Sequence, residues 1–175
     1  MTRLIVLGLL DEQPMSGYDI QQKIRHADAE RWGGVLVGSI YHALKKLEQE
    51  NHIELSDVRQ TGNRQKSIYQ ITNQGRAYLN LLILDSLHTK SVIYPTRLYS
   101  GISLLGKVPT KDAQQALLQQ KDLLNQEYQS LKRGNEKNIN EKIEVPPLSK
   151  LTIDNLFAIL QLQQQFIDEI LKTLE

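Results

Sequence analysis

The stretch GSIYHALKKLEQE, residues 38–50, decides the fold, because its apolar side chains fall on one side of a helix and its polar ones on the other. The positions that recur at the spacing of a buried helical face are Ile40, Ala43, Leu44 and Leu47. The pattern predicts a helix from about Ser39 to about Glu50 with one buried and one exposed face. The segments on either side of this helix indicate the kind of domain to which it belongs.

Two shorter helices are predicted before this stretch. Residues 4–10 are mostly apolar and predict a short, buried helix that stops before Gln13-Pro14. Ser16 is a suitable N-cap for a second helix. The positions of that helix at core spacing are Tyr18, Ile20 and Ile24. Trp32-Gly33-Gly34 predicts a loop, since paired glycines interrupt helices.

After residues 51–52 the apolar period changes from helical to alternating. The apolar members of the alternation are Ile53, Leu55, Val58, Ile68 and Ile71. Between them, the polar and basic residues 60–66 predict the tip of a two-stranded hairpin, and Thr72 is expected to cap a further helix. Three helices followed by a hairpin wing and another helix is the order of a winged helix-turn-helix domain.

The second half of the chain predicts longer helices. A short apolar helix is expected from Ile93 to Leu105, and Pro109-Thr110 then opens a long polar helix. Residues 133–147 are rich in Asn, Lys, Glu and Pro and predict a loop, and a last helix is expected from about Leu151 to Leu174. Amphipathic helices of this length cannot bury their apolar stripes on a DNA-binding unit that is already complete. They are therefore expected to pack on each other and on a second copy of the chain.

These elements predict a mainly α protein with a small β-hairpin and two domains. Residues 1–87 would form the winged helix-turn-helix DNA-binding domain. Residues 88–175 would form a C-terminal α-helical domain for dimerisation and for binding an effector. The predicted assembly is a homodimer held together by the C-terminal helices.

The exposed face of the 39–50 helix predicts contacts with a double-stranded DNA operator. A helix in the major groove needs donors near its N-terminus for base edges, and cations for phosphates. The candidate residues are Ser39, Tyr41, His42, Lys45, Lys46 and Gln49. A lysine pair on an exposed helix usually only keeps the surface hydrated. Its position in the third helix, directly before a wing, favours contact with DNA instead.

The predicted hairpin supplies a second candidate patch. Its residues are Arg59, Asn63, Arg64 and Lys66. A basic wing reaches sideways to the minor groove or to its phosphates. The alternative is an exposed, hydrated turn without a partner. In this order along the chain, the two patches together favour sequence-specific DNA binding.

Several motifs around these residues resemble the PadR family of transcriptional regulators. They are LGLL at 7–10, GYDI at 17–20, GSIYHALKKLE at 38–48, and YQIT at 69–72 followed by Gly75-Arg76. The resemblance covers residues 3–80 in detail and the C-terminal half in pattern and length only. One departure is His42, because the family usually has proline after this tyrosine, and proline would rigidify the first turn of the helix.

The resemblance implies a homodimeric repressor whose C-terminal helices wrap around the partner subunit. It implies that Ser39, Tyr41 and the residues after them contact DNA. Tyr18 and Tyr69 would support the fold, with contact between a tyrosine hydroxyl and a phosphate as the alternative role. It also implies a small aromatic effector, since relatives include repressors released by phenolic acids and others that respond to flat, lipophilic drugs. We assign no residue to that effector from the sequence.

Composition and missing motifs exclude other classes of function. The formal net charge is +1, so DNA binding must come from a local basic face. The chain has no cysteine, its four histidines have no metal-ligand spacing, and it lacks a phosphate-binding glycine loop and a serine elbow. We therefore expect no enzyme, no metal and no cofactor.

A cytoplasmic location is expected. The N-terminal apolar run is short and is followed by Asp11-Glu12 where a signal peptide would need small residues. No segment approaches the roughly 20 apolar residues of a membrane span.

Two classes of function remain open from the sequence. The first is a DNA-binding regulator, either repressor or activator. The second is a protein-interaction module, whose winged domain is a scaffold and whose C-terminal helices dock on another transcription factor.

Overall fold

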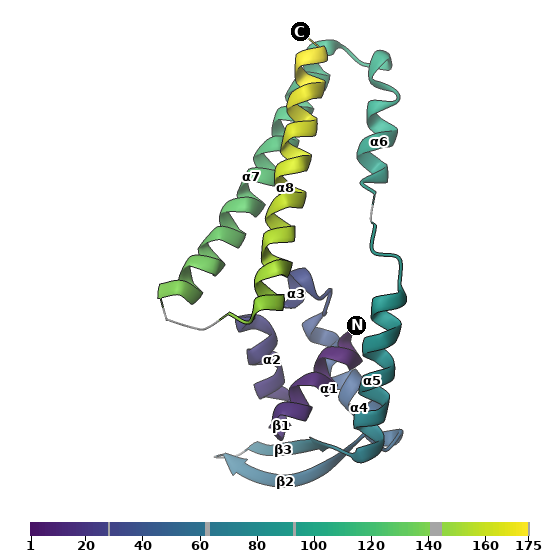
Figure 1. The fold of residues 1–175 in the computed structure, drawn as a ribbon, viewed down its shortest axis with the longest axis vertical. Helices are drawn as coiled ribbons and strands as arrows, with labels where there is room; N and C mark the ends of the chain where they lie inside the picture. The colour runs from purple at the N-terminus through teal and green to yellow at the C-terminus, as the bar shows by residue number, and fades with distance from the viewer. Residues whose placement is uncertain (28, 62–63, 93, 141–144, 175) are drawn as a thin grey trace. The chain divides into compact units, whose positions relative to one another are not determined.

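The computed structural model describes residues 1–27, 29–61, 64–92, 94–140 and 145–174 (Figure 1). The chain forms two compact units, Met1–Val92 and Ile93–Glu175. Each unit is described by itself below. Within the described ranges, no helix combines the length and the apolar character needed to cross a bilayer.

The first unit is a winged helix-turn-helix domain, as the order of sequence patterns predicted. Its elements are α1 (Thr2–Glu12), β1 (Met15–Ser16), α2 (Gly17–His26), α3 (Ala29–Trp32), a 3-10 turn (Val37–Ser39), α4 (Ile40–Gln49), β2 (Ile53–Thr61), β3 (Arg64–Ile71) and α5 (Asn73–His88). The predicted helix of residues 39–50 is α4, and the wing is the β2–β3 hairpin.

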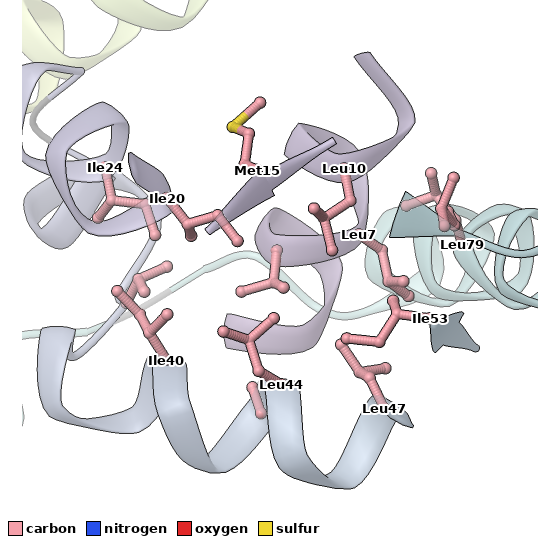
Figure 2. Packing of buried hydrophobic residues seen from close by; sticks show 14 of the residues in the cluster. Leu7, Leu10, Met15, Ile20, Ile24, Ile40, Leu44, Leu47, Ile53 and Leu79 are labelled. Carbon is pink, nitrogen blue, oxygen red and sulfur yellow. The ribbon is translucent and has the colours of Figure 1, made fainter. Parts of the chain in front are cut away.

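The core of this unit lies where α4 packs against α1 and α2 (Figure 2). Ile40, Leu44 and Leu47 point from α4 toward the side chains of those two helices, and each is at most 2% exposed. The partners labelled in Figure 2 are Leu7, Leu10, Met15, Ile20, Ile24, Ile53 and Leu79. The predicted buried face of α4 is therefore confirmed.

Side-chain caps begin two of the helices at the predicted residues. Ser16 Oγ accepts a hydrogen bond from the Asp19 backbone N–H at 3.2 Å, and the Asp19 carboxylate accepts one in return from the Ser16 N–H, also at 3.2 Å. This reciprocal pair is a capping box at the start of α2. Thr72 Oγ1 accepts from the Gly75 N–H at 3.0 Å and caps α5.

The end of α4 is shaped for an abrupt turn into the wing. Asn51 has a φ of 59°, in the left-handed region that asparagine tolerates. The Asn51 N–H donates to the Glu48 carbonyl at 3.0 Å, and the His52 N–H donates to the Leu47 carbonyl at 2.8 Å. Together these bonds form a Schellman motif, which satisfies the last carbonyls of the helix and starts β2 four residues after α4 ends.

The sheet differs from the predicted hairpin in two ways. It has three antiparallel strands in the order β1-β3-β2, because the two-residue β1 pairs Met15 with Tyr69 and Ser16 with Ile68. The strands also continue through most of the predicted tip, with Gln60 opposite Gln65 and Thr61 opposite Arg64. Polar residues pair here because an exposed ribbon has no buried face to impose alternation.

Burial corrects the interpretation of three apolar positions. Leu55 and Val58, predicted to alternate inward, are 48% and 47% exposed, and the register shifts between Leu55 and Asp57. Tyr18, placed at core spacing, is 57% exposed. It precedes the buried Ile20 by two residues, about 200° around the helix, so the two side chains cannot share a face.

The predicted loop at residues 32–34 begins one residue later than expected. Trp32 ends the short helix α3, and its indole Nε1 donates to the Ala27 carbonyl at 2.7 Å. This bond folds the ring back over the preceding turn. The loop itself starts at Gly33, and Gly34 has a φ of 59°.

Among its described residues, the second unit has only helices as regular elements. Its elements are α6 (Thr96–Ile102), a 3-10 turn (Leu105–Lys107), α7 (Thr110–Asn140) and α8 (Pro147–Thr173). The helices α7 and α8 are antiparallel, since Tyr128 packs edge-on against Phe157 while Lys121 donates to Asp168. Gln114, near the start of α7, also donates to the Leu174 carbonyl.

Three boundaries in this unit correct the sequence-based expectations. The helix predicted from Ile93 to Leu105 is shorter, Thr96–Ile102. The loop predicted from Arg133 is wrong up to Asn140, because α7 continues to that residue. Asn, Lys and Glu do not break a helix, and no proline occurs in this part of the chain before residue 146. Residues 141–144 of the predicted loop lie outside the described residues, and α8 begins at Pro147.

Gly75 is expected to be essential for the stability of the first unit. A Cβ at this position would lie 1.9 Å from the His52 backbone carbonyl oxygen, which also accepts the Thr72 N–H at 3.1 Å. Gly75→Ala should therefore lower the free energy of unfolding by about 3 kcal/mol, the upper end of the usual cost of overpacking, as measured by urea denaturation. The matched control is Gly8→Ala in α1, where a Cβ meets nothing within 4 Å. Equal unfolding midpoints for the two variants would contradict this account.

Asp19→Asn tests the electrostatic part of the α2 cap. Partial burial alone would raise the pKa of Asp19, but hydrogen bonds from Lys66 and Ser16 hold that pKa below its ordinary value. A lowered folded-state pKa stabilises the fold above the unfolded pKa, and the contribution is lost as the pH falls through the folded pKa. We expect the variant to be less stable by up to about 1 kcal/mol near neutral pH. Urea titrations should show the deficit shrinking toward pH ~3, and a deficit independent of pH would count against this origin.

Candidate nucleic-acid interface

The side of α4 away from the core presents a continuous polar face. Its members are Tyr41, His42, Lys45, Lys46 and Gln49, and all five are exposed. Because Ile40, Leu44 and Leu47 are buried, the rotation of the helix about its axis is fixed, and these five side chains must point outward. Aromatic, imidazole, amide and ammonium groups on one helical face supply hydrogen bonds for base edges and positive charge for phosphates.

Ser39, the sixth candidate on this segment, is engaged within the protein. Its hydroxyl donates to the Leu36 carbonyl at 2.6 Å. The same oxygen lies 2.8 Å from Thr2 Oγ1, and because the Ser39 proton is already used, Thr2 is the donor in that pair. Ser39 therefore connects the N-terminal ends of α1 and α4, and in this arrangement its oxygen can only accept a further bond.

Tyr41 lies against the start of α2. A Cβ on Gly17 would approach Tyr41 Cε1 to 2.8 Å and Leu44 Cδ1 to 3.0 Å. The missing side chain of Gly17 therefore makes room for the tyrosine ring, although the ring remains 58% exposed. This contact places Tyr41 against the glycine of the GYDI motif.

An ion-pair network fixes the other end of α4. Arg3 of α1 donates two hydrogen bonds to the Glu50 carboxylate, both at 2.8 Å, and a third to the Tyr78 hydroxyl at 3.3 Å. The bond from Arg3 holds the pKa of Glu50 below its ordinary value, and the same bond raises the pKa of Arg3. Tyr78 in turn stacks on His52, with ring centroids 4.2 Å apart. Sequence reasoning missed these residues because they lie far apart in the chain.

The wing carries acids beside its cations. Arg59 donates to Asp57 at 2.9 Å, and this bond holds the pKa of Asp57 below its usual value. Lys66, directly opposite Arg59 in the ribbon, donates to Asp19 at 2.9 Å. The net charge of the wing is therefore smaller than its cations alone suggest.

Two further wing candidates are placed less fully. Arg64 begins β3, and Asn63 lies outside the described residues.

A cleft of about 650 Å³ adjoins the polar face of α4. Its walls come from the start of α1, from α4 and from the end of α5, and they include Thr2, Arg3, His42, Lys46 and Asp85. In the part of the chain that the structure describes, no group of three or more His, Asp or Glu side chains is arranged to hold a metal ion.

Comparison with known proteins identifies the family. Residues 6–81 match the model of the transcriptional regulator PadR-like family. Uncharacterized protein X of Lysinibacillus sphaericus is 31% identical over 91 residues, which are 51% of this chain and 81% of that protein. The region that the family model matches includes the helix-turn-helix and the wing.

Solved structures match over nearly the whole chain. Bacillus subtilis PadR in complex with operator DNA superposes with a TM-score of 0.76 at 21% identity, over 99% of this chain and 98% of that one. The same protein in complex with p-coumaric acid gives a TM-score of 0.73 at 19% identity, over 98% and 93% of the two chains. At these identities the likeness shows a common fold, including the C-terminal helices.

The family match and the shared fold confirm the resemblance that the sequence motifs indicated. They also confirm that the chain is not an enzyme, since proteins of this family are DNA-binding regulators. The chain belongs to the PadR-like family of transcriptional regulators.

Proposed function

We propose that this regulator is a homodimeric repressor that places α4 in the major groove of its operator. The observation that carries the proposal is the polar face of α4, which is fixed outward by the buried face and followed directly by the wing. Tyr41, His42 and Gln49 would then reach base edges, while Lys45 and Lys46 contact phosphates. The wing, with Arg59, Asn63, Arg64 and Lys66, would lie at the neighbouring minor groove.

Exposed apolar side chains support dimerisation through the C-terminal helices. On α8 these are Leu148, Leu151, Ile159 and Leu162, which are between 50% and 78% exposed. Their positions i, i+3, i+11 and i+14 lie on one side of the helix. An apolar stripe of this length is costly to leave in water and fits a second copy. Two recognition helices related by two-fold symmetry would read half-sites roughly 34–36 Å apart, or somewhat further for a wide dimer.

The effector belongs to the same proposal. Bacillus subtilis PadR binds operator DNA in one structure and p-coumaric acid in another. In the second unit, a groove of about 360 Å³ between α6 and α7 is lined mainly by apolar side chains, with Arg97 and Asp112 among the others. Its size and lining suit a small aromatic ligand. Because the operator would be chromosomal, the proposal places the protein in the cytoplasm.

The competing functions differ in what they require of α4. An activator would use the same DNA contacts, so it shares this interface with the repressor. A protein-interaction module, in which the C-terminal helices dock on another transcription factor, requires no DNA contact from Lys45 or Lys46. Substitutions on the exposed face of α4 therefore distinguish a DNA-binding regulator from a protein-interaction module.

Removing the two lysines of α4 tests DNA binding directly. The purified protein is first used to select the fragments of its own genome that it retains at low salt. Lys45→Ala with Lys46→Ala should then weaken binding to a selected fragment. It should also reduce the slope of log K against log salt by up to about 2, because each lysine on a phosphate releases about 0.9 of a counterion. Filter binding over a series of salt concentrations measures both effects.

The control for charge is Lys111→Ala with Lys150→Ala, two exposed lysines of the second unit. It removes the same charge and should leave the salt slope unchanged. Unaltered affinity in the α4 variant would favour the protein-interaction module. A wild-type protein that retains no fragment would overturn the proposal as a whole.

The apolar stripe of α8 predicts a second result. Leu151→Glu with Leu162→Glu places two charges in the stripe and should convert the dimer to a monomer at micromolar concentration. Each carboxylate buried in the interface would cost about 2 kcal/mol or more. Sedimentation velocity measures the mass. The control is Gln161→Glu, at an exposed position about 100° around the helix from Leu162, which should remain dimeric. A wild-type protein that sediments as a monomer would refute the proposed assembly.

A further inference from the structure

The carboxylate of Asp19 joins the start of α2 to the wing, which meets DNA in the proposed function. Its Oδ2 accepts hydrogen bonds from Ser16 N at 3.2 Å and from Ser16 Oγ at 2.8 Å, within the cap of α2. Its Oδ1 accepts a hydrogen bond from Lys66 Nζ at 2.9 Å, across 47 positions of sequence. One side chain therefore both completes the start of α2 and holds the wing.

The direction of Lys66 follows from the pleat of β3. Side chains two residues apart point to the same face of a strand, so Lys66 shares its face with Ile68, which is only 6% exposed. The ammonium group lies 6.0 Å from the centre of the Tyr18 ring as well as next to Asp19. Lys66 thus points toward α2, and its side chain is only 34% exposed.

The contact lies where the wing leaves the three-stranded part of the sheet. The short strand β1 pairs with β3 only at Tyr69 and Ile68. From Ser67 toward its end, the wing is a ribbon of β2 and β3, from Val58 opposite Ser67 to Thr61 opposite Arg64. A two-stranded ribbon is marginally stable by itself and twists easily. A tie at Lys66 therefore acts at the base of the segment whose direction is least constrained by the sheet.

We propose that Asp19 is a positioning residue for the wing, and that Lys66 is a strut between β3 and α2 and does not neutralise a phosphate. This rests on the proposed DNA-binding function and specifies how one of its cations acts. The pair keeps the wing at a fixed angle to α2, against which Tyr41 of α4 also rests. The start of α2 therefore contacts both α4, through Tyr41, and the wing, through Lys66. These two contacts hold α4 and the wing in a fixed position relative to each other.

The strut and a phosphate contact predict different salt behaviour. A lysine that neutralises a phosphate releases counterions and contributes about 0.9 to the salt slope on any duplex. A lysine that keeps its own carboxylate partner releases none. It affects only the DNA whose groove geometry depends on the wing angle, so it contributes to the preference for one sequence over another.

The test uses the full-length protein with Asp19→Asn and Lys66→Met together. This double variant has the same net charge as the wild type, so a loss of affinity cannot arise from a change in net charge. We expect affinity for a selected genomic fragment to fall by about two- to fivefold, the range of an exposed or half-exposed ion pair. Affinity for a random duplex of equal length and the salt slope should both be unchanged.

Lys66→Met alone is the companion variant, because it leaves Asp19 bonded to Ser16 and the α2 cap intact. It should show the same loss on the selected fragment without a change in salt slope. Lys66→Arg, which keeps a cationic donor, should restore the affinity. Lys45→Met is the reference for a phosphate contact, with a slope lower by about 0.9 on both duplexes.

Two results would overturn the strut. One is a salt slope that falls by about 0.9 in the double variant together with weaker binding to random DNA, which would make Lys66 a phosphate contact. The other is unchanged affinity of both variants for both duplexes, which would leave the pair without a role in binding. Either result is distinct from failure of DNA binding itself, in which the wild type also retains no fragment.

Discussion

Burial of one face of α4 is the constraint on which the rest of the first unit depends. Ile40, Leu44 and Leu47 are almost fully removed from water, and burying each such side chain is worth about 1.5–3 kcal/mol. A helix is a rigid cylinder, so fixing this face also fixes the direction of the opposite one. The same packing that folds the unit therefore presents Tyr41, His42 and the lysines to solvent.

Packing alone leaves α4 free to slide or tilt, and polar contacts at its two ends restrict that freedom. At the start, Ser39 is bonded to Thr2, and at the end Arg3 forms a double hydrogen bond to Glu50. Both contacts lead to the first three residues of α1. Partly exposed pairs of this kind add little stability, about 1 kcal/mol or less each. Their value is directional, since they hold both ends of the helix that carries the proposed DNA contacts.

The sequence predicted what depends on local patterns and missed what depends on distant partners. The caps at Ser16 and Thr72 and the buried and exposed faces of α4 follow from spacing and could be predicted residue by residue. The strand β1 could not, because two residues carry no period, and it exists only through pairing with Tyr69 and Ile68. The end of α7 was missed because polar composition was taken as a loop, although the segment has no proline and a single glycine, Gly134, does not end the helix. For the site, exposure was predictable, but the partner of Lys66 lies 47 residues away.

These partners change how the charge of the interface should be weighed. A count of cations in the sequence gives the wing the same importance as α4. In the folded unit, Arg59 and Lys66 each have a carboxylate within 2.9 Å, and the whole chain carries a net charge of only +1. The paired cations of the wing therefore add less to a field that attracts DNA than their number suggests, and in the proposed function the wing contributes mainly through its shape. The shape of the wing matters only if its angle to the rest of the unit is fixed. The buried and capped start of α2 is suited to fix that angle, whereas a flexible loop is not.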